Sequence, residues 1–122
     1  MVIRDYKELM AYQKAYELVL LIYQLTESFP KEEIYGLSSQ IRRAAVSIPS
    51  NIAEGFMRGS KEYVQFLKIA LGSAAELETQ LMLCRDLGYC GSDRFSEMHA
   101  QTKEVLRLLN SYIAKMNERL KK

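Results

Sequence analysis

The sequence of 122 residues is poor in the side chains from which most catalytic and metal sites are built. It has no tryptophan, one histidine, His99, and two cysteines, Cys84 and Cys90. A zinc site needs several His or Cys ligands at fixed spacing, and these two cysteines have no companion pair. His99 lies in a helical pattern without a Ser or Cys at the spacing of a nucleophile and base. We therefore expect structural thiols, a surface histidine, and no metal, cofactor, small-molecule substrate or enzymatic activity.

Long apolar runs are also absent, because Lys, Arg, Glu or Gln interrupts every hydrophobic stretch. None approaches the roughly 20 residues that a membrane-spanning helix needs. The first residues, Met1 to Asp5, lack the basic region, apolar stretch and cleavage site of a signal peptide. No glycine-rich phosphate-binding loop is present either. From these absences we expect a cytoplasmic chain with no membrane partner.

The residues that are present have the composition of an ordinary globular protein, with 48% hydrophobic and 26% charged residues. A chain of this length buries roughly two thirds of the surface that its unfolded form exposes, so it needs no disulfide or metal to hold a core. We expect a single domain that covers residues 1–122.

The chain has few helix-breaking residues, with two prolines and six glycines, and these divide it into four pieces of helical length. In each piece apolar residues recur at spacings of three and four, which is the pattern of an amphipathic helix. The expected helices cover about residues 6–28, 35–57, 60–87 and 93–120. With short connections between them, they predict an all-α fold, an antiparallel up-down-up-down four-helix bundle.

Individual residues predict where these helices stop and bend. Pro30 ends the first helix, because proline disfavours helical geometry in the residue before it. Pro49 falls inside the second helix and predicts a kink there, not a break. We interpret Gly55 and Gly59 as a helix stop followed by a tight turn, in preference to a GxxxG packing motif. Ser60 is expected to cap the third helix.

The second helix has an unusual outer face, because small polar side chains replace the Lys and Glu expected beside water. Projected at the helical angle, this face carries Ser39, Arg43, Ser47, Ser50 and Glu54, with Asn51 at its margin. Such groups permit close approach and supply hydrogen bonds, so we predict that the face meets another subunit. The alternative is that it lies in a larger or asymmetric core of one chain.

The third helix also has two faces. Its second face is half apolar and consists of Phe66, Ile69, Ser73, Glu76, Gln80 and Leu83. A helix with two such faces is expected when the bundle core covers one and an oligomer covers the other. Arg42 or Arg43 could pair with Glu54 or Glu76 across this interface, since the planar guanidinium meets a carboxylate with two hydrogen bonds. The predicted interface therefore includes Glu76.

The run Leu37–Gly55, LSSQIRRAAVSIPSNIAEG, is highly distinctive and resembles a bacterial family of four-helix bundles first described from reading frames inside intervening sequences of 23S ribosomal RNA. The segments AYQKA at 11–15, FLKIALGS at 66–73 and ELET at 76–79 agree, so the resemblance covers nearly the whole chain. One departure is Tyr12, where the family pattern often has tryptophan. The resemblance implies a homopentameric ring similar to the accessory proteins of diversity-generating retroelements, which bind nucleic acid and a reverse transcriptase. It does not imply an enzyme.

The formal net charge of +2 comes from the last helix, because the final 31 residues hold seven basic and four acidic side chains. The candidate nucleic-acid contacts are Arg107, Lys115, Arg119, Lys121 and Lys122. Nucleic-acid-binding domains typically have a pI above 9, and the pI of this chain is lower, at 8.5. Basic residues at a helix C-terminus also interact favourably with the helix dipole, which is a structural reason for their presence. Two hypotheses follow: an oligomeric scaffold associated with RNA or DNA, and a protein-binding adaptor or structural ring without a nucleic-acid role.

Overall fold

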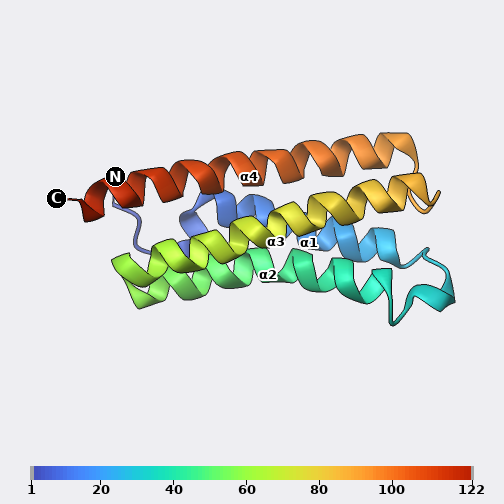
Figure 1. The fold of residues 1–122 in the computed structure, drawn as a ribbon, viewed down its shortest axis with the longest axis horizontal. Helices are drawn as coiled ribbons and strands as arrows, with labels where there is room; N and C mark the ends of the chain where they lie inside the picture. The colour runs from blue at the N-terminus through green and yellow to red at the C-terminus, as the bar shows by residue number, and fades with distance from the viewer. Residues whose placement is uncertain (1, 122) are drawn as a thin grey trace.

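Four α-helices carry the fold in the computed structural model, which describes residues 2–121 (Figure 1). The helices are α1 (Met10–Thr26), α2 (Leu37–Arg58), α3 (Ser60–Asp86) and α4 (Ser92–Leu120). Short 3-10 helices, η1 (Tyr6–Glu8) and η2 (Lys31–Glu33), precede α1 and α2. Residues 2–121 contain no strand. The predicted all-α bundle of four helices is confirmed, and α2, α3 and α4 begin and end within two residues of the expected positions.

Each helix packs against two neighbours around one core. α1 and α3 each lie beside α2 and α4, whereas the backbones of the diagonal pairs lie farther apart within residues 2–121. Figure 1 shows the chain running back along the bundle after each connection. Both termini and the α2–α3 connection therefore lie at one end, here termed the terminal end. The α1–α2 and α3–α4 connections lie at the other, the loop end.

The core is built from the apolar stripes that the spacing of three and four predicts. Its largest fully buried apolar side chains are Leu18, Ile22, Leu25, Ile41, Ile48, Ile52, Leu67, Leu77, Leu81, Val105 and Leu109. Thr102 is the polar member of the α4 stripe and is also fully buried. Its hydroxyl donates to the carbonyl of Met98 at 2.7 Å, so burial leaves no polar group of this side chain without a partner.

The first helix is shorter than expected, because the chain leaves helical geometry at Leu9. Asp5 caps the preceding turn by accepting a hydrogen bond from the backbone N–H of Lys7 at 2.8 Å. The side chain of Gln13 donates to the carbonyl of Lys7 at 2.8 Å, which holds the turn against α1. These bonds replace one long helix over 6–28 with η1 followed by α1. The predicted start at residue 6 and end at residue 28 are therefore corrected to 10 and 26.

The connection between α2 and α3 differs from the expectation at two residues. A Cβ at Gly55 would lie 2.5 Å from the Cβ of Phe66, so this glycine allows α2 and α3 to approach closely and is not a helix stop. The helix continues to Arg58, and Gly59, with φ of 107°, forms the turn alone. Ser60 is the first residue of α3 and makes no capping bond, so its predicted capping role is wrong.

α2 continues through Pro49 without interruption, as predicted. Pro49 is buried and has no N–H to donate to the carbonyl four residues earlier, at Ala45. The bend expected there stays a prediction. None of the helices is both long and apolar enough to be a candidate membrane span within the described residues.

Candidate functional site

A groove runs along the seam between α1 and α2, here termed the α1/α2 groove. Its loop-end part has a volume of about 710 Å³ and its middle part about 360 Å³, and Val46 lines both. The loop-end part is lined by Tyr23, Thr26, Glu27, Phe29, Pro30, Lys31, Ile34, Ser38, Ser39, Arg42, Arg43, Val46 and Ser47. The middle part is lined by Tyr12, Tyr16, Val19, Leu20, Val46, Pro49, Ser50 and Ala53.

Large apolar side chains in this groove are open to solvent. Tyr16 and Leu20 are each 53% exposed, Tyr23 is 41% exposed, and Val46 is 38% exposed. A single exposed apolar residue on a protein surface is ordinary, but a contiguous group marks an interaction surface. The groove therefore presents a contiguous set of apolar side chains to solvent.

The loop-end part of the groove is basic. Lys31, Arg42 and Arg43 line it, and Glu27 is the one acidic side chain among its lining residues. Arg42 is fixed by its neighbours, because its Nε donates to the Thr26 hydroxyl at 2.7 Å and its guanidinium lies 4.5 Å from the ring centre of Tyr23. Arg43 is exposed and makes no ion pair with a residue in the range 2–121. It is thus available to an acidic partner.

The predicted outer face of α2 is divided between two neighbours. Ser39, Arg43 and Ser50 line the α1/α2 groove. Ser47, which also borders the groove, forms a 2.8 Å hydrogen bond to the hydroxyl of Ser73 in α3. Asn51 donates to both the carbonyl and the hydroxyl of Ser47, at 2.7 and 2.9 Å. Part of the small polar face therefore serves the packing of α2 on α3 within one chain.

The acidic residues of the predicted interface have partners on their own helix turns. Glu54 accepts from Arg58 at 2.8 Å, and Arg58 also contacts Glu62 at 3.2 Å. Glu76 accepts from the side chain of Gln80 at 3.2 Å and makes no ion pair among residues 2–121. Within a protomer, neither carboxylate meets the arginines of the groove. A pair between copies stays a prediction.

The contribution of α1 to the groove was not foreseen from the sequence. A signal was present, because Tyr12, Tyr16, Val19 and Tyr23 repeat at spacings of four and three beside the stripe of Ala15, Leu18, Ile22 and Leu25. A helix with two apolar stripes has more apolar surface than one core can cover.

The predicted basic residues of α4 do not form one group. Arg107 lies in mid-helix, exposed, with its nearest acid, Glu104, at 3.9 Å. Lys115, Arg119 and Lys121 are exposed at the terminal end. Lys122 lies outside the described residues. The basic end is therefore built from the last two turns of α4, where the helix dipole also favours cations.

The cysteines and the histidine have structural surroundings. Cys84 and Cys90 are buried free thiols, and burial raises the pKa of Cys84 to about 12, which keeps it protonated at neutral pH. His99 is partly exposed, and its ring stacks on Phe95 with centres 5.0 Å apart while its Nε2 lies 2.9 Å from an Oε atom of Glu78. Residues 2–121 contain no group of three or more His, Cys, Asp or Glu side chains that could hold a metal ion.

These observations define a four-helix-bundle protein with two distinguishing surface features: the α1/α2 groove and the basic end of α4. The sequence pattern of the 23S rRNA-intervening sequence protein family matches residues 7–111. The chain belongs to this family, as the resemblance of Leu37–Gly55 predicted. Its family description names no enzymatic activity.

A solved structure supports the same assignment. The chain is similar to a protein with unknown function from the S23 ribosomal protein family of Bacteroides thetaiotaomicron VPI-5482, with a TM-score of 0.79 and 26% sequence identity. The match covers 85% of this chain and 98% of that protein. No protein with a curated functional description matches the sequence.

Proposed function

We propose that this chain is a non-enzymatic, homo-oligomeric scaffold of the bacterial cytoplasm, assembled through the α1/α2 groove and associated with RNA or DNA. The observation that carries the proposal is the groove itself, where exposed Tyr16, Leu20 and Val46 adjoin a basic loop-end part. A second copy of the chain is the occupant that the surface chemistry favours.

The outer face of α3 supplies a complementary surface. Ile69 and Leu83 are 50% and 47% exposed on this face. Glu76 lies between them on the same side of the helix, two turns from each. Lys31, Arg42 and Arg43 make the groove basic, so apolar and charged groups match between the two surfaces. Since the surfaces differ, contacts between copies run head to tail, which closes a ring when the rotation fits. The family resemblance favours five copies.

A charge exchange tests the pairing of Arg43 with Glu76. Arg43→Glu and Glu76→Arg each place like charges together across the interface, which costs about 2–5 kcal/mol per contact. We expect either single variant to lower the mass measured by light scattering, and the double variant to restore it. Lys103 is an exposed residue of α4 that lies outside the groove and outside the outer face of α3. Lys103→Glu is therefore the matched control and should leave the mass unchanged.

The wild-type mass decides the proposal as a whole. A ring of five gives five times the 14.1 kDa of the chain. A particle of 14.1 kDa at micromolar concentration would overturn the scaffold, and unchanged assembly in both single variants would overturn the Arg43–Glu76 contact. Val46→Lys provides a second probe. Assembly would bury the lysine charge in the apolar middle part of the groove, so we expect this variant to assemble less than the wild type.

Nucleic-acid association is the second part of the proposal. Lys115, Arg119 and Lys121 lie at the terminal end, and assembly of several copies would multiply this patch. Gel-shift titration with a ribosomal RNA fragment at low and high salt tests it, because phosphate contacts weaken steeply as salt rises. We expect salt-dependent retention that falls in a Lys115→Gln/Arg119→Gln variant. Retention that is absent, or insensitive to salt, would favour the adaptor.

A further inference from the structure

Polar side chains dominate the lining of the loop-end part of the α1/α2 groove. Four Ser and Thr residues and three cations line it, and its volume of about 710 Å³ lies within the usual range for small-molecule sites. Hydroxyl, ammonium and guanidinium groups all donate hydrogen bonds. A concave space lined by this many donors has the chemistry of an anion site.

The donors on α2 follow the helical repeat. Ser38 and Ser39 precede Arg42 and Arg43 by four residues each, and all four line the loop-end part of the groove. Residues four apart are neighbours on the same side of a helix. Each hydroxyl is therefore one turn from a guanidinium along the groove. Lys31, in η2, adds a cation from a second element.

Arg42 is held in place by its own chain. Its Nε donates to the Thr26 hydroxyl, and its guanidinium lies against the ring of Tyr23. Its two terminal nitrogen atoms have no hydrogen-bond or ion-pair partner in the described part of the chain. A guanidinium fixed at Nε and free at its terminal atoms offers a pair of N–H donors, which is the geometry that binds two oxygens of one phosphate.

Ser38 has a buried side chain whose hydroxyl makes no internal hydrogen bond. The other buried polar side chains, Thr26, Gln80 and Thr102, each form one. Ser38 is 8% exposed, and no hydrogen bond joins its hydroxyl to another of residues 2–121. Its oxygen is not among the fully enclosed atoms without a partner, and the residue lines the groove. The hydroxyl is therefore open to an acceptor that enters the groove.

The charge of the lining favours a dianion. Lys31, Arg42 and Arg43 give three positive charges against the single negative charge of Glu27. A phosphate on a monoester carries about −1.5 to −2 charges at neutral pH and has three acceptor oxygens. A carboxylate has one charge and two oxygens, so it would leave more of these donors unused. The apolar part of the lining provides a surface for an organic group and consists of Phe29, Pro30, Ile34 and Val46.

We propose that the loop-end part of the α1/α2 groove binds a small phosphomonoester, with the phosphate on Arg42, Arg43 and the Ser38 hydroxyl. The organic group of the ligand lies against the apolar part of the lining. This goes beyond the proposed function, because all the donors belong to one chain and assembly is not needed to form the site. The site shares Arg43 with the proposed contact to Glu76 of a second copy. Ligand and second copy therefore compete, and the ligand should lower the mass of an assembled protein.

Calorimetric titration of the full chain with phenyl phosphate, at constant ionic strength, tests the site. We expect saturable binding that Ser38→Ala weakens about fivefold, since one hydrogen bond is lost. Arg43→Gln should weaken it at least about tenfold through the loss of a charge-assisted contact, and Arg43 is exposed, so the fold tolerates the change. Lys103→Gln, outside the groove, should bind as the wild type does. The Glu76→Arg variant is titrated as well, because its groove stays uncovered if assembly uses Glu76.

Two competitors identify the ligand class. Inorganic phosphate should bind more weakly than phenyl phosphate, because it makes no contact with the apolar lining, and equal binding would overturn the place given to the organic group. An oligothymidylate without terminal phosphates has only phosphodiesters. If it competes as well as phenyl phosphate does, the phosphomonoester is wrong.

The remaining outcomes separate this site from the proposed assembly. Absence of saturable binding in both the wild type and Glu76→Arg would overturn the site and leave the assembly intact. Binding that neither Ser38→Ala nor Arg43→Gln weakens would also overturn it, since the ligand would then lie elsewhere. A monomeric wild type that binds phenyl phosphate would instead overturn the assembly alone. If the wild type is assembled, light scattering should show its mass falling as phenyl phosphate saturates, and an unchanged mass would overturn the competition for Arg43.

Discussion

The two flanks of α2 carry similar small polar side chains, but one flank is packed against α3 and the other is open to solvent. On the flank toward α3, the Ser47 and Ser73 hydroxyls meet at 2.8 Å and Gly55 leaves no room for a Cβ against Phe66. On the flank toward α1, the helices part and leave the α1/α2 groove, which Ser39 and other small polar residues of α2 line. Small residues therefore permit close approach on one flank, while the other remains available to a partner.

This difference shows that a face of small polar residues does not by itself identify an oligomer interface. What separates the flanks is the neighbouring helix. α3 follows α2 after the single residue Gly59 and packs on it more extensively than α1 does, whereas α1 places the exposed rings of Tyr16 and Tyr23 beside the groove. The closed flank is expected to contribute to folding stability, and the open flank to assembly.

The largest effect is expected at Gly55. Gly55→Ala places a methyl group 2.5 Å from the Cβ of Phe66, an atom held by the backbone of α3. We expect a loss of about 2 kcal/mol in the free energy of unfolding from overpacking. Urea denaturation of both proteins at the same chain concentration measures it.

Gly72→Ala is the matched control for this substitution, because Gly72 lies inside α3 with open space where its Cβ would be. Alanine should there raise the free energy of unfolding by up to about 1 kcal/mol through helix propensity. Effects of the same sign at the two glycines would contradict the close approach of α2 and α3.

A smaller effect is expected at the serine pair. Ser73→Ala should lower the free energy of unfolding by about 1 kcal/mol, since it removes the hydrogen bond between the helices, and Ser47→Ala should lower it by at least as much, because it also removes the hydroxyl that accepts from Asn51. The double variant should lose less than the sum of the two. A double-mutant cycle measures this coupling, and strict additivity would mean that the hydroxyls do not interact.

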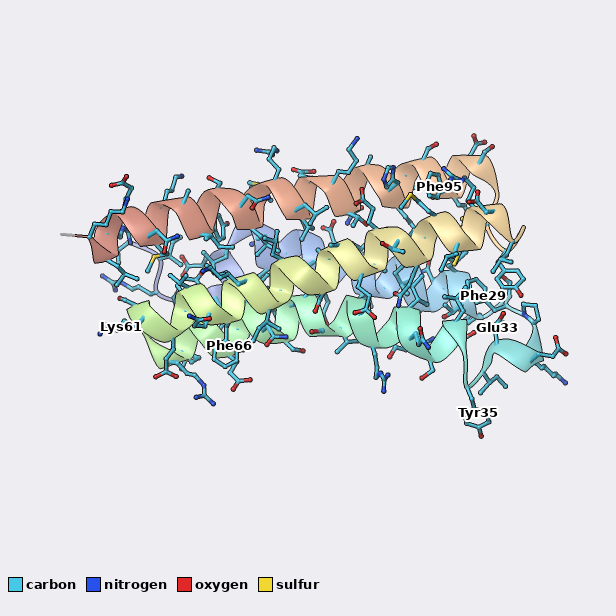
Figure 2. The ribbon with its side chains drawn as sticks, in the orientation of Figure 1. Phe29, Glu33, Tyr35, Lys61, Phe66 and Phe95 are labelled. Atoms are coloured by element: carbon cyan, nitrogen blue, oxygen red, sulfur yellow. The ribbon has the colours of Figure 1, made fainter. Side chains whose placement is uncertain are left out.

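The smallest effect concerns the loop end, where Glu33 holds the start of α2 (Figure 2). One carboxylate oxygen accepts from the backbone N–H of Leu37 at 3.1 Å, and the other accepts from the Tyr89 hydroxyl at 2.8 Å. These two bonds, the backbone one first, hold the pKa of Glu33 below its ordinary value. The ionised form is therefore favoured in the folded state.

A lowered pKa makes this contribution to stability present above the ordinary pKa of a glutamate, and it is lost as the pH falls through the folded-state value. Tyr89→Phe removes one of the two bonds, so it should reduce the stability difference between neutral and mildly acidic solution. Thermal melts of both proteins at several pH values measure this. The same pH dependence in the two proteins would show that the Tyr89 bond does not form in solution.

The sequence was sufficient to predict the four helices, because spacings of three and four are a local property of each segment. It failed at Leu9 and Ser60, where local hydrogen bonds and the turn at Gly59 set the helix starts, and at Gly55, where a contact with another helix decided the outcome. Gly55 shows this best, since a helix stop and a packing glycine have the same local sequence, and Phe66 distinguishes them.

The position of a residue on a helix face can be calculated from the sequence, and Ser39, Arg43 and Ser50, which were placed on the outer face of α2, line the groove. That they meet another subunit stays a prediction. The share of Tyr16 and Leu20 was missed, since their exposure depends on how far α1 stands from α2.

The sequence by itself determined the helices, their apolar stripes and the family, through hydrophobic periodicity and the run Leu37–Gly55. Only the tertiary structure decided which flank of α2 is closed and which is open. The physical reason is that burial and pairing depend on distances between helices, and these distances are set by all four helices packing around one core.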